Sequence, residues 1–181
     1  MRHLSIVALL LVLISCASAP SLDYYAVDMT RSAAGGESVN LAVGRFSVSD
    51  KLDRHQIVIQ ESPTRIAYYA TDRWASSIGE MVEQKLAAEF GPVDGTLRSL
   101  IVEGRILAFE QVDSAAGPVA KASLDVIIRE GESKRYEAPL LEKSYTVERP
   151  ASEDSVDAVV RALSRALEEI AAEIAEDAAG L

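Results

Sequence analysis

The amino-acid sequence predicts an α+β domain with two layers, a mostly antiparallel sheet and two helices packed on one of its faces. Two observations predict this class. Short β-branched and aromatic runs are followed by an amphipathic helix pattern, then by three long strand patterns and a final helix pattern. Apolar and polar residues alternate in the long strands, which is typical of an antiparallel sheet with one buried face. Elements in this order favour helices layered on a sheet.

The first part of the domain is predicted to contain short strands. Residues 22–27 (LDYYAV) form an aromatic and β-branched run that indicates a first or edge strand. Residues 40–48 (NLAVGRFSV) indicate a second strand. The runs at 56–62 (QIVIQES) and 65–70 (RIAYYA) are separated by a turn that contains proline, so they predict a hairpin.

A helix is predicted next, from its cap, its apolar stripe and its stop signal. Ser77 and Glu80 have the spacing of a capping box, and Gly91-Pro92 is a typical helix terminator. The stripe at steps of three and four consists of Trp74, Ile78, Met81, Val82, Leu86 and Phe90.

Three long strands are predicted at 97–112, 119–130 and 135–148, with turns between them marked by glycine and proline. The residues expected to share one face of the first are Leu100, Val102, Ile106, Ala108 and Val112. Pro150 ends the last strand, and Ser152 is the predicted N-cap of the final helix.

The final helix has an apolar stripe opposite several glutamates. The stripe consists of Val156, Val159, Val160, Leu163, Leu167, Ile170 and Ile174. Packing on the sheet is the favoured interpretation, and a coiled coil with a partner is the alternative.

The N-terminus carries a short basic head and an apolar run, Leu4–Ile14, that is too short to cross a bilayer and fits a secretory signal. Ala17-Ser18-Ala19 offers an ordinary cleavage site. The favoured interpretation is that Leu13-Ile14-Ser15-Cys16 resembles a bacterial lipobox, in which the cysteine sulfur takes a diacylglycerol and the freed amine takes an acyl chain such as palmitate. Two or three chains anchor a protein firmly, whereas one holds it only marginally.

The predicted domain organisation follows from this motif. Residues 1–15 are the lipoprotein signal peptide, 16–22 the lipidated tether, and 23–181 one periplasmic α+β domain. The mature chain would contain 181 − 15 = 166 residues, which suits one domain with a sizeable core.

Composition argues against several classes of function. A net charge of −10 disfavours nucleic-acid binding, which depends on Lys and Arg contacts to phosphate. Lipidation would use the only cysteine, and His55 is the only histidine outside the signal, in a polar stretch where a solvated side chain is expected. The sequence has no phosphate-binding loop or HExxH motif. We therefore expect no catalytic residues, no metal and no cofactor.

The stretch from Leu41 to Phe90 resembles the ABC-type transport auxiliary lipoproteins, the family that includes paraquat-inducible protein C. The residues that carry the resemblance are Tyr24-Tyr25, the strand ending near Val48, Asp53-Arg54, Tyr68-Tyr69 and Trp74. The lipobox and the final acidic helix agree with it. One departure is that Ala75 stands where a proline often follows the tryptophan.

The resemblance implies a non-enzymatic accessory protein of an MCE-domain (mammalian-cell-entry) lipid transport system, docking to the MCE protein in the periplasm. By the sorting rule for such lipoproteins, Ala17 after the cysteine favours the outer membrane. A second copy of the chain is another candidate partner. The alternative function is a stand-alone lipid-binding or outer-membrane assembly lipoprotein that uses a cleft between sheet and helices.

Tyrosines, tryptophan and arginines near the predicted hairpin are candidates for partner binding, because these residue types are common interaction hot spots. The candidates are Tyr24, Tyr25, Arg54, Arg65, Tyr68, Tyr69, Arg73 and Trp74. Core packing is the competing interpretation for the aromatic residues, and it is favoured for Trp74. One ring of the Tyr68-Tyr69 pair is expected to face inward and the other outward.

Overall fold

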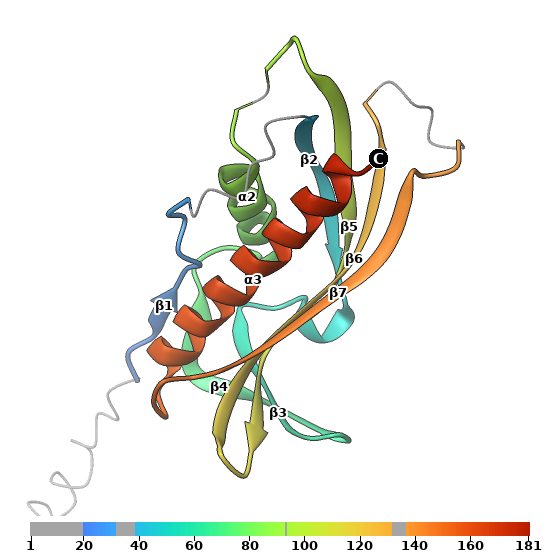
Figure 1. Cartoon of the computed structure of the whole chain (residues 1–181). Coiled ribbons are helices and arrows are strands. Elements are labelled where there is room, and N and C mark those ends of the chain that lie inside the picture. The colour runs from blue at the N-terminus through green and yellow to red at the C-terminus, as the bar shows by residue number, and fades with distance from the viewer. Residues whose placement is uncertain (1–19, 32–38, 93, 132–136) are drawn as a thin grey trace, which may run out of the picture.

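The computed structural model describes residues 20–31, 39–92, 94–131 and 137–181 (Figure 1). The strands are β1 (Asp23–Tyr25), β2 (Val39–Val48), β3 (Gln56–Ser62), β4 (Arg65–Trp74), β5 (Arg98–Ser114), β6 (Gly117–Glu130) and β7 (Leu141–Pro150). The helices are α2 (Ile78–Phe90) and α3 (Val156–Ala179), and a 3-10 turn, η2, covers Asp50–Leu52.

All strands belong to one sheet, in the order β1-β4-β3-β5-β6-β7, with β2 paired to β5 beside this path. The pairs β3–β4, β5–β6 and β6–β7 are antiparallel, whereas β1–β4, β2–β5 and β3–β5 are parallel. The α+β class is confirmed, with a mixed sheet whose longest ladders are antiparallel. The first strand is an edge strand, as predicted.

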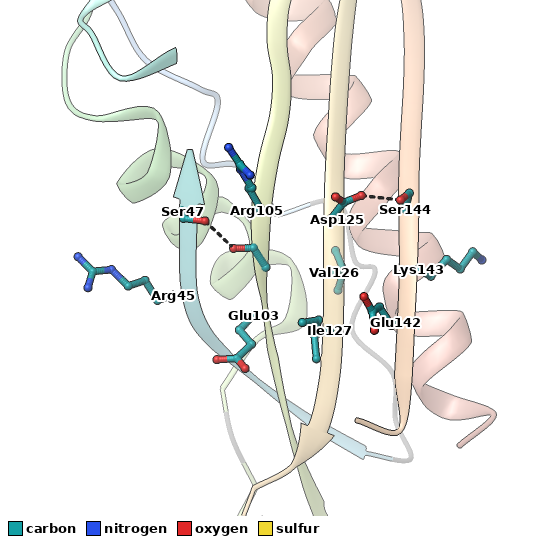
Figure 2. A pocket seen from close by; sticks show the side chains of 11 residues that line it. Arg45, Ser47, Glu103, Arg105, Asp125, Val126, Ile127, Glu142, Lys143 and Ser144 are labelled. Atoms are coloured by element: carbon teal, nitrogen blue, oxygen red, sulfur yellow. Dashed lines mark hydrogen bonds between the residues drawn. The ribbon is translucent and has the colours of Figure 1, made fainter. Parts of the chain in front are cut away.

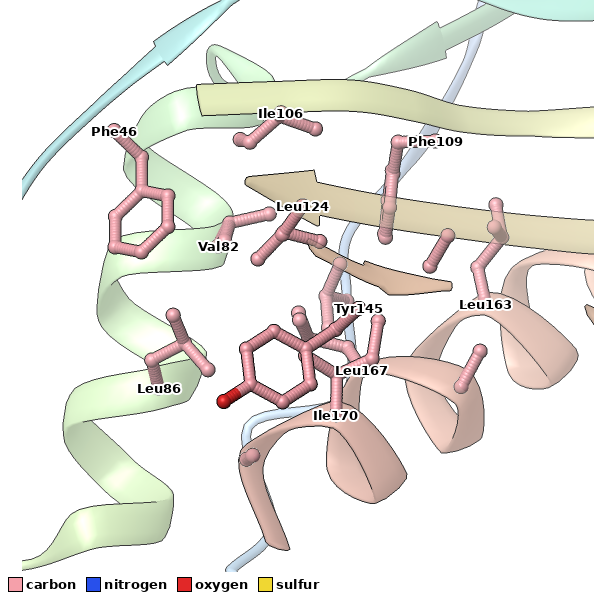
Figure 3. Close-up of a cluster of buried hydrophobic side chains, with 14 of the residues drawn as sticks. Phe46, Val82, Leu86, Ile106, Phe109, Leu124, Tyr145, Leu163, Leu167 and Ile170 are labelled. Atoms are coloured by element: carbon pink, nitrogen blue, oxygen red, sulfur yellow. The ribbon is translucent and has the colours of Figure 1, made fainter. Parts of the chain in front are cut away.

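Both helices lie on the same side of the sheet, where they contact each other (Figure 1). Helix α2 packs on β2, and α3 packs on β6 and β7. Apolar side chains from both layers form one continuous cluster, which includes Phe109, Tyr145 and Leu163 (Figure 3). Burial of this surface is the main stabilising contribution to the fold. The packing of the last helix on the sheet is therefore confirmed.

The predicted helix limits are correct for α2 and partly wrong for α3. The Ser77 hydroxyl accepts a hydrogen bond from the Glu80 backbone N–H, and Gly91 ends α2 with a positive φ of 79°. The N-cap of α3 is Ser155 rather than Ser152, because the Ser155 hydroxyl accepts from the Ala158 N–H at 3.2 Å.

One face assignment in β5 is also wrong. The register against β6 shifts between Ile106 and Ala108, which reverses the faces of the residues that follow. Phe109 therefore faces the helices and packs against Trp74, with ring centroids 5.4 Å apart. Ala108 and Val112, predicted to face the core, consequently belong to the opposite face.

Candidate interaction surface

The predicted partner-binding residues begin at β1, where the chain enters the sheet. In the parallel register of β1 with β4, Tyr24 lies beside Arg73 and Tyr25 beside Trp74. The Tyr24 side chain is 64% exposed, whereas Tyr25 packs partly against the core. Burial and a hydrogen bond to Asp72 raise the pKa of the Tyr25 hydroxyl to about 12. Tyr24 is therefore available to a partner, and Tyr25 serves mainly to fix β1.

Arg73 uses its guanidinium within its own strand. The register between β3 and β4 shifts in this stretch, so β4 bulges before its end. The Nη1 atom donates to the carbonyl oxygens of Tyr69 at 2.9 Å and Asp72 at 3.0 Å, and Nη2 donates to that of Ala70 at 2.8 Å. These contacts satisfy backbone acceptors of the bulge.

The Tyr68-Tyr69 pair differs from the expectation, because both rings are half-buried. The Tyr68 hydroxyl donates to the Lys51 carbonyl at 3.4 Å, and the Arg54 guanidinium lies 4.3 Å from the ring centroid, a cation–π arrangement. The Tyr69 hydroxyl donates to Oε1 of Gln111 at 2.6 Å, and burial raises the pKa of Tyr69. Each ring is thus held by specific contacts, and neither is fully outward.

Arg65 lies at the turn between β3 and β4 and is exposed. Its side chain is 77% exposed and forms an ion pair with Glu61 at 2.5 Å. An exposed pair of this kind contributes little to stability, so Arg65 can exchange partners readily.

Trp74 is part of the core and is removed from the predicted partner-binding set. Its side chain is 0% exposed, which confirms the core interpretation of this residue. It ends β4, so its place in the predicted helix stripe is wrong. The remaining candidates separate into Tyr24 at the β1 edge, Arg65 at the hairpin turn, and the Arg54–Tyr68 pair beside η2.

A hollow of about 580 Å³ lies on the sheet face opposite the helices (Figure 2). Residues of β2, β5, β6 and β7 line it, including Arg45, Glu103, Arg105 and Asp125. These side chains project away from the core because strand residues alternate between faces. The hollow therefore presents charges of both signs.

A second hollow, of about 570 Å³, lies between the end of β2 and the start of α2. Arg45, Arg54 and His55 line it together with Asp53, and it shares Arg45 and Ser47 with the first hollow. The two hollows and the Arg54–Tyr68 pair thus form one continuous polar surface, which we call the Arg45–Arg54 surface. The sequence analysis missed Arg45, whose only signal was its polar position in an alternating strand.

The described residues contain no group of three or more His, Cys, Asp or Glu side chains that could hold a metal ion. His55 is exposed, and its Nδ1 atom lies 3.3 Å from the Trp74 carbonyl oxygen.

No helix within 20–31, 39–92, 94–131 or 137–181 has both the length and the apolarity to cross a bilayer. Cys16, the predicted lipid attachment site, lies outside the described residues.

Comparison with protein families gives a match over residues 22–175 to the family described as the ABC-type transport auxiliary lipoprotein component. The chain belongs to this family. The match spans nearly all of the described domain, from the residue before β1 to the last turns of α3. As an ABC-type transport auxiliary lipoprotein component, the chain is an accessory of an ABC transport system, a role that points away from catalysis. No curated protein sequence matches the chain.

Two solved structures share the fold of this auxiliary lipoprotein component. Protein XCC0632 from Xanthomonas campestris, a DUF330 protein, is 21% identical with a TM-score of 0.69, over 83% of this chain and 91% of the other. A crystal structure of an uncharacterized protein is 16% identical with a TM-score of 0.68, over 88% of this chain and 99% of the other. At these identities the likeness is one of fold.

Proposed function

We propose that this chain is an outer-membrane-anchored periplasmic lipoprotein that docks to the MCE-domain protein of an ABC-type intermembrane lipid transport system. In this proposal residues 1–15 are removed, Cys16 is lipidated, 16–22 form the tether and 23–181 form the docking domain. The domain acts by binding and performs no catalysis.

The family match carries this proposal, because it begins at residue 22, the last residue of the expected tether. A lipobox-like Cys16 lies six residues upstream, since 22 − 16 = 6. The order of lipid site, short tether and folded domain suits a protein that holds a soluble partner close to a membrane. Thioether-linked and amide-linked acyl chains together would give a stable anchor.

The Arg45–Arg54 surface is the proposed docking site. Its lining carries as many acidic as basic side chains, so it favours a partner surface that itself presents charges of both signs. Arg54 stacked on Tyr68 supplies a preorganised aromatic and cationic pair, the combination found at interface hot spots. Arg65 and Tyr24 are exposed at separate places and would contact the partner only at its rim.

The alternative function, stand-alone lipid binding, requires an open cleft between the sheet and the helices. The space between the helices and the sheet is filled by the continuous core cluster, with side chains such as Leu124 and Leu167 fully buried. A lipid chain would therefore have to displace core residues, at the cost of their packing.

Affinity capture tests the proposal directly. The full-length chain carrying a C-terminal tag would be purified from detergent-solubilised cell envelope, and its co-purifying proteins identified by mass spectrometry. We expect an MCE-domain protein together with an ABC permease. The matched control is the double variant Arg54→Ala, Tyr68→Ala, which should be equally abundant in membranes but should capture less. Absence of any transporter subunit from the wild-type sample would overturn the proposal, and lipid alone would favour the stand-alone alternative.

A further inference from the structure

Residues 26–31, which follow β1, form a strap that lies across both helices. Val27 is only 3% exposed and belongs to the core cluster. The Asp28 backbone N–H donates to the Ser164 hydroxyl of α3 at 3.1 Å. The Thr30 carbonyl accepts a hydrogen bond from Nζ of Lys85 in α2 at 2.5 Å. The strap is therefore held by one apolar side chain and by two polar contacts from different helices.

Lys85 is the central contact of this strap. Its side chain is 0% exposed, and its Nζ lies 2.6 Å from Glu89 and 3.0 Å from Glu168. A lysine ammonium has three donors, and here the acceptors are the two carboxylates and the Thr30 carbonyl. Burial of an ammonium is costly unless its donors are satisfied. The strap thus supplies one of the three acceptors that allow Lys85 to be buried.

The end of the strap is also fitted to α2. Gly91, the C-cap of α2, has no side chain, and a Cβ atom there would lie 2.8 Å from the Arg31 guanidinium. Arg31 consequently packs over the carbonyl end of α2, where a positive charge is favourable. Strand β1, on the other side of the strap, consists of only three residues at the edge of the sheet. The segment 23–31 therefore depends on few contacts compared with the long ladders of β5 and β6.

We propose that the strap is released together with β1 as one segment, residues 23–31, and that this segment sets the length of the membrane tether. This inference rests on lipidation of Cys16, which is part of the proposed function. With the strap seated, the first fixed residue is Asp23, and 23 − 16 = 7 residue steps separate it from the anchor. With the strap released, the chain is free at least as far as Arg31, which is 31 − 16 = 15 steps from the anchor.

The two states differ greatly in reach. At ~3.5 Å per extended residue, seven steps span at most about 25 Å, whereas 15 steps span about 50 Å. The seated strap keeps the domain close to the membrane surface, and the released strap lets it meet a partner deeper in the periplasm. The contacts of Val27, Lys85 and Ser164 determine the balance between these states.

Hydrogen exchange on the full lipidated chain tests whether the strap is released independently. The protein would be reconstituted in vesicles of phosphatidylethanolamine and phosphatidylglycerol. We expect Val27→Asp and Ser164→Ala to accelerate exchange of the amides at 24–31 at least tenfold, with β5 and β6 as protected as in the wild type. Met29→Asp is the matched control, since Met29 belongs to the same segment but is exposed, and it should exchange like the wild type. If the exchange rate at 24–31 does not change, or if it rises equally in β5 and β6, the strap is not released independently of the rest of the domain.

Energy transfer tests the link between the strap and reach. A dye on Ala115→Cys, at the exposed turn between β5 and β6, would transfer energy to a labelled lipid in the same vesicles. We expect Val27→Asp to lower the transfer efficiency and Met29→Asp to leave it unchanged. If Val27→Asp accelerates amide exchange at 24–31 but leaves the transfer efficiency unchanged, the strap does not control how far the domain extends from the membrane. Neither readout involves the MCE-domain protein, so a failure of partner capture would bear on the proposed function alone. If the wild-type chain does not bind the vesicles, it is not lipidated, and the tether mechanism is refuted as well.

Discussion

Nη1 of Arg73 lies 2.9 Å from the carbonyl oxygen of Tyr69, four residues earlier in the same strand. Together with the contacts to Ala70 and Asp72, this interaction closes the bulge of β4 from within. Arginine suits this position because its planar group presents several donors in a fixed geometry. Arg73 lies beside aromatic residues in the sequence and was a candidate for partner binding. Its contacts instead give it a structural function in β4, which explains its presence.

We therefore expect Arg73→Ala to lower the free energy of unfolding by about 1–3 kcal/mol, because carbonyls in a partly buried bulge lose charged donors. Urea denaturation followed by circular dichroism would measure the change. Arg65→Ala is the matched control, since Arg65 is exposed and its ion pair with Glu61 lies at the surface, and it should change stability by less than about 0.5 kcal/mol. Equal effects of the two substitutions would contradict the structural role of Arg73.

Asp177 connects the end of α3 to β7 and should make stability depend on pH. Lys143 Nζ lies 2.6 Å from its Oδ2 atom, and the Tyr145 hydroxyl donates to the same atom at 2.5 Å. These two hydrogen bonds hold the pKa of Asp177 below its usual value. The folded state therefore favours the ionised form of Asp177. The contribution of this carboxylate to the free energy of unfolding is fully present above the ordinary aspartate pKa. It is lost as the pH falls through the lowered pKa of Asp177 in the folded state.

The expected result is that Asp177→Asn is less stable than the wild type at neutral pH, and that the difference shrinks as the pH falls below about 4. Thermal unfolding across this acidic range would measure it. Lys143→Met keeps Asp177 but removes its principal partner, so the stability of this variant should depend less on pH. A constant difference between wild type and Asp177→Asn at all pH values would be inconsistent with this ion pair as its source.

Leu163 tests the packing of α3 on the sheet. Its side chain is completely buried in the core cluster, so Leu163→Asp places an unpaired carboxylate among apolar side chains. We expect a loss of at least about 3 kcal/mol, enough to unfold a marginally stable domain. The comparison variant is Arg161→Ala, on the exposed side of the same helix, which should melt like the wild type. Similar melting curves for the two variants would mean that α3 does not need the sheet.

The sequence predicted the layers and most elements because their signals are local. The Ser77 cap and Gly91 stop define α2, and the alternation of apolar residues defines the long strands. The faces in β5 could not be predicted after Ile106, since the register shift is decided by pairing with β6. Trp74 fits the helix period, but its pairing with Tyr25 of β1 places it at the end of strand β4.

The candidate site was predicted less well than the fold, for reasons of geometry. Sequence proximity grouped Arg54, Arg65 and Arg73, but the bulge turns Arg73 back onto its own backbone and the hairpin carries Arg65 to its turn. Arg45 joins Arg54 only because β2 and α2 meet at one hollow. No local feature of the sequence distinguishes Lys85 from other polar residues of a helix. Its burial depends on the strap and on Glu168, which are distant in sequence.

Cys16 should determine membrane attachment without affecting the fold. In Cys16→Ser the thioether cannot form, so we expect no labelling by a fatty-acid probe and recovery outside the membrane fraction. The circular dichroism spectrum should be unchanged, because the described domain begins after this residue. Ala17→Ser is the matched control and should be lipidated normally. A Cys16→Ser protein that still labels would place the lipid elsewhere in the chain.

The Arg54–Tyr68 pair is the most specific part of the proposed docking surface. The guanidinium lies 4.3 Å from the ring centroid, and the Tyr68 hydroxyl reaches the Lys51 carbonyl, so both side chains are held in place before a partner arrives. Preorganisation lowers the entropy lost on binding. We expect Arg54→Ala combined with Tyr68→Ala to weaken binding of the MCE-domain partner by at least about 2 kcal/mol, the scale of an interface hot spot.

Isothermal titration of the purified full-length protein in detergent with the MCE-domain partner would measure this loss. Tyr68 is half-buried, so its removal should also lower the melting temperature, and Tyr68→Phe separates the two effects. That variant keeps the ring under Arg54 and loses only a long hydrogen bond, so it should bind like the wild type. Tyr24→Ala and Arg65→Ala serve as controls at the edge and at the turn, where we expect small effects. If the double variant binds normally while Tyr24→Ala binds weakly, the docking site lies instead at the β1 edge, where an exposed strand can pair with a partner strand.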